Sequence, residues 1–187
     1  MAFNQTISYG LLVLLLLAAV AGILFFSKIK RGYADWRLFQ TVKKLGHEVM
    51  QNIILADGMD GTVYIDNLVL MPDGIMVVSV GRYQGAVFAS ENIDIWTQVV
   101  GQRSYKFSNP LLKLEQDIAA VRAHLPKINT IGILIFSADV NFPKGKPDNV
   151  ISMDEAKQRF AGAHDKQVTA ELLAAWKEIK NKIQPEA

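Results

Sequence analysis

The longest uncharged run in the sequence lies close to its N-terminus. Residues 10–26, GLLVLLLLAAVAGILFF, are 17 residues without a charge, and Ile7-Ser8-Tyr9 extend the run to 20. A helix of that length spans about 30 Å, which is the thickness of the hydrocarbon core of a bilayer. We therefore predict one transmembrane helix, with the membrane contacted through residues 7–26.

Charged residues flank this run on one side only. A cleaved signal peptide is the alternative interpretation, but it would need a basic stretch followed by a shorter apolar run. No Lys or Arg precedes the run, whereas Lys28, Lys30 and Arg31 follow it. Because cytoplasmic flanks carry the positive excess, we expect a single-pass protein of a bacterial inner (plasma) membrane. Its N-terminus would lie outside and its C-terminal domain in the cytoplasm.

The remaining residues are close to electrically neutral. The chain has 20 Lys and Arg against 18 Asp and Glu, and beyond residue 31 it has 17 basic and 18 acidic residues, a net charge of −1. Such a domain is expected to bind nucleic acid only weakly. The sequence has no cysteine, which excludes disulfides, thiolate zinc sites and cysteine nucleophiles.

The pattern of apolar residues predicts a mixed α/β (α+β) fold. Apolar residues at helical spacing indicate an amphipathic helix over 33–55, and a β-branched run indicates a strand over 62–70. Further strands are expected within 74–85 and over 86–89, 95–100, 104–107 and 130–136. Helices are expected after Asn109-Pro110, after the capping box of Ser152 and Glu155, and over 166–182. The predicted parts are an anchor with its basic flank (1–31), a domain (32–165), and a C-terminal helix with a tail (166–187).

The order of short motifs resembles the nuclease-related (NERD) domain, a branch of the restriction-endonuclease-like fold. The motifs are Gly46-His47-Glu48-Val49 on the predicted first helix, Ile65-Asp66-Asn67-Leu68-Val69-Leu70, Pro72-Asp73-Gly74-Ile75-Met76-Val77-Val78, Gly85, Trp96, and Phe107-Ser108-Asn109-Pro110-Leu111. The resemblance runs from about Leu45 to Phe160. It implies a restriction-endonuclease-like core flanked by helices and preceded here by the transmembrane helix.

The resemblance also implies where a catalytic site would lie. In the family, Glu-x-Lys follows the Gly-Ile-x-Val-Ile strand, so both side chains face the Asp of the neighbouring strand, here Asp66. Carboxylates there would hold Mg²⁺ and the lysine would act at the scissile phosphate. In this sequence Ser79 and Gly81 occupy those two positions, and Lys113 replaces a glutamine after Asn-Pro-Leu-x. The catalytic motif is therefore degenerate.

Several alternatives remain open for these residues. Asp66 is either a remnant metal ligand or a strand-end residue that accepts backbone hydrogen bonds, and Glu48 is either a weak metal candidate or a solvated helix residue. A missing cation could come from Lys113 or Arg82, and a missing acid from Glu91 or Asp94.

The sequence thus favours a membrane-anchored domain that acts as an interaction or scaffold module. No confident catalytic residue, no small-molecule substrate and no cofactor are inferred. A divergent nuclease, which alone would need Mg²⁺, and non-catalytic nucleic-acid binding are the alternatives. The interaction or scaffold module would have a protein partner.

Overall fold

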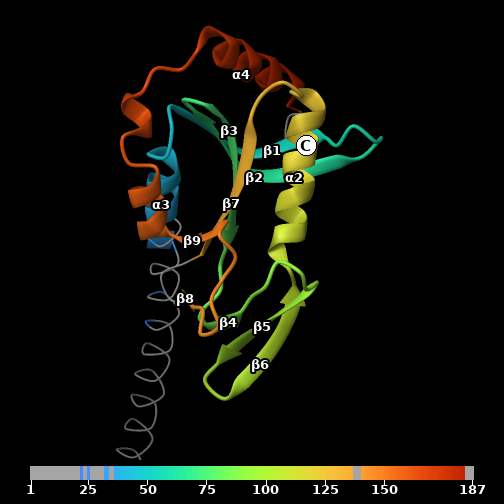
Figure 1. Ribbon diagram of the computed structural model, residues 1–187. Coiled ribbons are helices and arrows are strands. Elements are labelled where there is room, and N and C mark those ends of the chain that lie inside the picture. Colours follow the sequence, from blue (N-terminus) through green and yellow to red (C-terminus); the bar gives the residue numbers. More distant parts are fainter. Residues whose placement is uncertain (1–21, 23–24, 26–31, 34–35, 137–139, 184–187) are drawn as a thin grey trace, which may run out of the picture. The chain divides into compact units, whose positions relative to one another are not determined.

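Figure 1 shows the computed structural model, which describes residues 22, 25, 32–33, 36–136 and 140–183. The chain divides into two units, Met1–Arg37 and Leu38–Ala187. Both hydrophobic core clusters consist of residues of the second unit, so this unit has the apolar interior that a separate domain needs. Most of the predicted span of residues 7–26 lies outside the described residues. No helix within the described part of the chain is long and apolar enough to cross a membrane.

The first sheet has five strands in the order β1-β2-β3-β7-β9. β1, β2 and β3 are antiparallel neighbours, whereas β3, β7 and β9 run parallel. The predicted turn at Pro72-Asp73 joins β2 to β3, where Met71 pairs with Gly74. The strand bounds are Glu48–Ala56 (β1), Thr62–Met71 (β2), Gly74–Gly81 (β3), Thr130–Phe136 (β7) and Val150–Ser152 (β9).

The second sheet has four strands in the order β6-β5-β4-β8, of which β4, β5 and β6 follow β3 in the chain and β8 follows β7. β5 and β6 form the predicted hairpin, which turns at Gly101-Gln102. Its strands are Gly85–Phe88 (β4), Ile95–Val100 (β5), Arg103–Ser108 (β6) and Val140–Asn141 (β8).

The helices begin where the sequence supplies caps. The Asn109 side chain accepts a hydrogen bond from the Leu111 amide at the start of α2 (Pro110–His124), and Pro110 sits where no amide is needed. Ser152 and Glu155 form the predicted capping box of α3 (Met153–Arg159). A short 3₁₀ helix, η1 (Ala163–Asp165), precedes α4 (Ala170–Lys182), which Thr169 caps.

Two apolar cores lie on the two faces of the first sheet. The alternation along β3 sends Ile75 and Val77 to the first core, with α2 and α4, and sends Met76 and Val78 to the second core, with α3. The mixed α/β fold is thereby confirmed. Figure 1 shows α2 running across the sheet near β7.

The predicted helix over 33–55 is wrong in its second half. The helix before the first sheet covers residues 36–43, and β1 begins at Glu48. Asn52 has a left-handed backbone with φ 50°, and Met50 and Ile53, three residues apart, both join the first core. A spacing of three imitates a helical pattern, although the backbone pairs with β2.

The C-terminal part also differs in detail from the prediction. The last helix begins at Ala170, four residues after the predicted Lys166, because the Thr169 hydroxyl caps it. The polar segment expected after β7 contains β8 and leads into β9. Both strands are too short to give a sequence signal.

Candidate functional site

The candidate site lies where the ends of β2 and β3 face α2. Asn67 pairs with Val78, so Asp66 and Ser79 are the next opposing positions of the two strands. Ser79 shares a strand face with Val77 of the first core, and the charge of Asp66 acts on Asp117 of α2. Asp66 therefore lies beside the end of β3 that carries Ser79 and Gly81.

Asp66 accepts a backbone hydrogen bond. Its half-buried carboxylate receives the amide of Val80 through Oδ2 at 3.2 Å. This contact ties β2 to the end of β3, as the strand-end interpretation of Asp66 expects.

Lys113 and Asp117 form an ion pair on the adjacent face of α2. The Lys113 ammonium donates to Asp117 Oδ2 and to the carbonyl of Tyr64, both at 2.6 Å. Four residues apart, the two side chains lie on one side of the helix. Lys113 thus bridges α2 to β2, two residues before Asp66.

Burial dominates the electrostatics of Asp117, whose side chain is only 1% exposed. Burial raises its pKa, the hydrogen bond and charge of Lys113 lower it, and the negative charge of Asp66 raises it again. The influence of Asp66 means that the two carboxylates are close enough to interact. A buried carboxylate with a perturbed pKa beside a lysine and a second acid is typical of functional sites.

Two buried oxygen atoms of this site have no hydrogen-bond partner among the described residues. They are Asp117 Oδ1 and the Ser79 hydroxyl, whose residue is 5% exposed. Buried polar groups are nearly always paired, with protein or with ordered water. Ser79 and Asp117 therefore have unused capacity for a water molecule or a cation.

Aromatic rings crowd the position of the family lysine. A Cβ on Gly81 would lie 3.0 Å from two ring carbons of Phe136. Phe136 belongs to a cluster of rings whose centroids are 4.2 to 6.3 Å from their neighbours: Tyr83, Trp96, Phe107, Phe136 and Phe142. Gly81 thus faces a packed aromatic core.

Glu48 lies elsewhere and has a structural role. It is the first residue of β1, and its carboxylate accepts a hydrogen bond from the Trp176 indole at 2.6 Å and pairs with Lys180, both on α4. Glu48 pairs across the sheet with Leu70, four residues from Asp66, or about 13 Å along a strand. The structure therefore does not bring Glu48 and Asp66 together.

The sequence analysis named other residues that could supply the missing cation or the missing acid. In the described part of the structure they are not part of this cluster. Arg82, Glu91 and Asp94 are exposed, the last two in the turn before β5. The acid that joins Lys113 is Asp117, which the sequence analysis missed. Its signal was the Lys-x-x-x-Asp spacing on a helix whose same side carries Leu114 and Val121 of the core.

The donor set limits what cation could bind. Within the described ranges no three His, Cys, Asp or Glu side chains form a metal-binding group. Asp66 and Asp117 are two carboxylates, which suits Mg²⁺ only if water or a substrate phosphate supplies most of its ligands. Lys113 already occupies one oxygen of Asp117.

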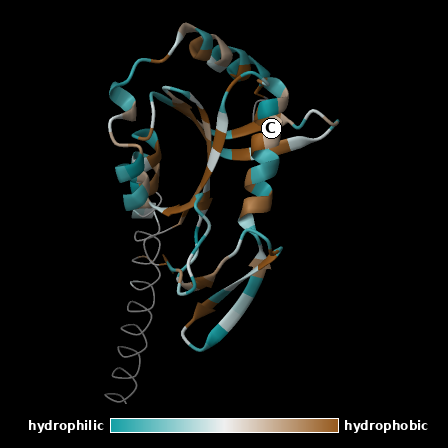
Figure 2. Ribbon diagram, in the orientation of Figure 1, coloured by the Kyte–Doolittle hydropathy of each residue, from teal (hydrophilic) through white to brown (hydrophobic). Residues whose placement is uncertain are grey.

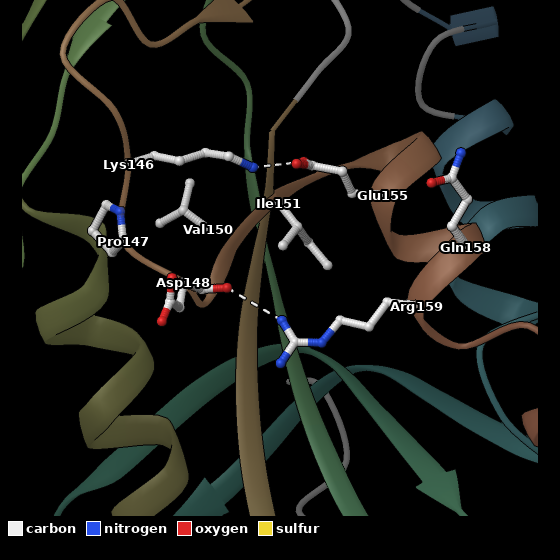
Figure 3. Close-up of a pocket in the computed structure, with 8 residues that line it drawn as sticks. All are labelled: Lys146, Pro147, Asp148, Val150, Ile151, Glu155, Gln158 and Arg159. Carbon is white, nitrogen blue, oxygen red and sulfur yellow. Dashed lines mark hydrogen bonds and ion pairs between the residues drawn. The ribbon is translucent and has the colours of Figure 1, made fainter.

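A separate pocket of about 510 Å³ lies beside β9 and α3. Figure 3 shows Glu155 and Arg159 reaching from α3 to the preceding loop, where they meet the Lys146 ammonium at 2.5 Å and the Asp148 carbonyl at 3.2 Å. Lys146 and the Ser152 amide lower the pKa of Glu155. Because its two cations and two acids balance, the pocket shows no preference for a charged ligand.

Replacing Asp117 by asparagine tests the electrostatics of the site. The pKa of Asp117 is higher in the folded protein than in the unfolded chain, so the folded protein binds the proton more readily. Folding stability is therefore lost as the pH rises from the unfolded pKa through the folded pKa and Asp117 ionises. The Asn variant should therefore be more stable than the parent at pH 7. The difference should vanish below about pH 4, the unfolded pKa. Urea denaturation across pH measures it, and a variant less stable at pH 7 would show that the ion pair outweighs burial.

Comparison with known proteins assigns the fold to a family. The family model for the nuclease-related domain matches residues 32–138, which include Asp66, Ser79, Gly81, Lys113 and Asp117. An uncharacterized protein of Bacillus anthracis is 26% identical over 85 residues, covering 46% of this chain and 40% of that protein. The match thus covers less than half of the length of this relative. No solved structure matches the present chain. This chain belongs to the nuclease-related domain (NERD) family.

Proposed function

We propose that the chain is a membrane-anchored, cytoplasmic nuclease-related domain that does not cleave nucleic acid and acts as an interaction or scaffold module. The observation that carries the proposal is the aromatic cluster against Gly81. A restriction-endonuclease-like active site needs room for an acid and a lysine on that strand, and the Phe136 ring crowds the position of the lysine. Ser79 offers a neutral hydroxyl where the family has a carboxylate.

Energetics supports the absence of catalysis. Each tenfold loss in rate corresponds to about 1.4 kcal/mol of transition-state stabilisation. Removing a metal ligand and a catalytic cation together costs several such factors. The fold would survive this loss, because the Lys113–Asp117 pair and the aromatic cluster now occupy the region.

A divergent nuclease is the second candidate, and one observation favours it. Lys113 and two carboxylates, Asp66 and Asp117, meet at the site. In that case Asp66 and Asp117 would hold a magnesium ion, which would activate water and offset phosphate charge. The exposed end of Lys113 would take the role of the missing lysine by neutralising charge on the phosphate.

The membrane anchor is tested by the topology of reporter fusions. A fluorescent protein fused after Ala187 should be active in the cytoplasm, and alkaline phosphatase at the same position should be inactive, because Lys28, Lys30 and Arg31 favour retention. As a control, replacing these three residues by glutamine should weaken the orientation. High phosphatase activity of the unmodified fusion would contradict the proposed topology.

A further inference from the structure

The second sheet has one face that the first core does not use. The side of β4 and β5 that carries Val87 and Trp96 packs into the first core. The strand pairing places the alternate residues on the opposite side. We call this side the outer face of the second sheet; it consists of Ala86, Phe88, Ile95, Thr97, Val99, Ser104, Lys106 and Ser108.

The outer face is accessible within the described part of the chain. None of its residues is buried, and Ile95 is 49% exposed. The nearby Ile93, in the turn before β5, is 46% exposed. Helices α2 and α3 pack against strands of the first sheet, and α4 contacts β1 through Glu48. Figure 1 shows the start of α2, which follows β6, as the labelled helical segment next to the β5–β6 hairpin. Figure 2 shows apolar residues along β5 and polar residues along β6.

The charges of the second sheet have one sign. β4, β5, β6 and β8 contain no Asp or Glu, although residues 32–187 together carry a slight negative charge. Lys106 projects from the outer face on the edge strand β6. Beside β4 on the same outer face, the Lys144 ammonium lies over the ring of Phe88, 5.8 Å from its centroid. Across the strands, Phe88 and Thr97 therefore separate Lys144 from Lys106, and the half-exposed Ile95 lies two residues along β5 from Thr97. The exposed acids Glu91 and Asp94 lie in the turn before β5.

We propose that the outer face of the second sheet docks onto an anionic phospholipid surface. Lysines near a bilayer gain energy from anionic headgroups, and exposed apolar side chains between them can enter the interface. Lys106 and Lys144 would contact the headgroups, and Ile95 would contact the acyl boundary. The proposal rests on the proposed membrane anchor for its biological setting.

The anchor explains how two lysines could suffice. Twelve residues lead from Phe26 at the end of the predicted span to Leu38 at the start of the domain. Fully extended, they reach at most about 40 Å. A domain tethered this closely meets its own bilayer at high effective concentration, so a weak contact is populated.

Nucleic acid fits the outer face less well than a membrane. Binding of single strands relies on exposed aromatic rings as stacking platforms. The exposed ring of the hairpin, Tyr105, pairs with Gln98 on the opposite side of the sheet, and Phe88 lies beneath Lys144. The outer face offers aliphatic side chains and hydroxyls instead.

The test uses residues 38–187, which have their own cores and lack the predicted span. Sedimentation with a large excess of vesicles detects weak binding without the tether. Vesicles of equal parts phosphatidylcholine and phosphatidylglycerol should then show salt-sensitive binding, and pure phosphatidylcholine vesicles in the same excess should not. Lys106→Gln and Lys144→Gln should each lower the partition coefficient roughly fivefold. Lys106→Glu with Lys144→Glu should lower it further, and Ile95→Ser should weaken it without changing the salt dependence.

The matched control reverses two exposed lysines elsewhere, Lys127→Glu with Lys177→Glu, which changes the net charge equally. It should leave binding nearly unchanged. Equal loss in the control, equal binding to neutral vesicles, no binding to anionic vesicles, or duplex DNA binding that replaces vesicle binding would each overturn the proposal. The vesicle experiment with the fragment tests only the outer face, and the reporter fusions test only the membrane anchor. The two proposals can therefore fail independently of each other.

Discussion

Replacing Trp176 by alanine is expected to lower the free energy of unfolding of residues 38–187 by about 3–5 kcal/mol. The side chain is 2% exposed and lies in the first core with three other residues of α4. Its indole also donates to Glu48, which would keep only its ion pair with Lys180. A loss of this size is a large part of the stability of an ordinary domain.

Urea denaturation of the fragment measures this effect, with Leu173→Ala as the matched control. Leu173 lies on the same helix but is 44% exposed, so its loss should cost roughly 0.5 kcal/mol or less. Glu48→Gln should have a smaller effect than Trp176→Ala, because an amide oxygen can still accept the indole hydrogen. If Trp176→Ala were as mild as Leu173→Ala, α4 would not be docked on β1.

This packing also extends the domain beyond the family match. The match ends at residue 138, whereas α3, η1 and α4 follow it. Their contacts return to the start of β1, where His47 stacks on His164 of η1 with ring centroids 5.4 Å apart. The C-terminal segment up to α4 is therefore an integral part of this fold.

Restoring the family residues, Ser79→Glu with Gly81→Lys, is expected to yield no cleavage of DNA or RNA. The new lysine would meet the Phe136 ring, and forcing extra atoms into a packed core costs about 1–3 kcal/mol. The new carboxylate would add charge beside Asp66. Thermal unfolding and cleavage assays with Mg²⁺ or Mn²⁺ would show an inactive and less stable variant.

The matched variant adds Phe136→Ala to the same pair of substitutions. Removing the ring opens the space beside position 81, so part of the overpacking is relieved, although the loss of a fully buried ring lowers stability. Metal-dependent cleavage by Ser79→Glu with Gly81→Lys, without Phe136→Ala, would show that the site has room for the lysine. That result would contradict the proposed crowding by Phe136.

The sequence predicted the elements whose signals are local. The turn at Pro72-Asp73, the β5–β6 hairpin and the cap at Asn109 each depend on a few adjacent residues, and all are present. β1 was mistaken for a helix because its strand character depends on pairing with β2, and because Asn52 breaks the alternation. Pairing between segments leaves little trace in the spacing of apolar residues.

The candidate site was predicted in part for the same reason. Alternation along two neighbouring strands placed Asp66 beside Ser79 and Gly81. Asp117 was missed because its role depends on how α2 packs on the sheet. The partner of Glu48, Trp176, lies 128 residues further along the chain, which no local pattern reveals.

The central claim is that this domain has lost nuclease activity, and cleavage by the unmodified fragment tests it most directly. Labelled single- and double-stranded DNA and RNA are incubated with residues 38–187 and Mg²⁺ or Mn²⁺. The account predicts no cleavage above that of the buffer, with or without Asp66→Ala. Metal-dependent cleavage that disappears in folded Asp66→Ala or Asp117→Asn variants would contradict it and establish the divergent nuclease.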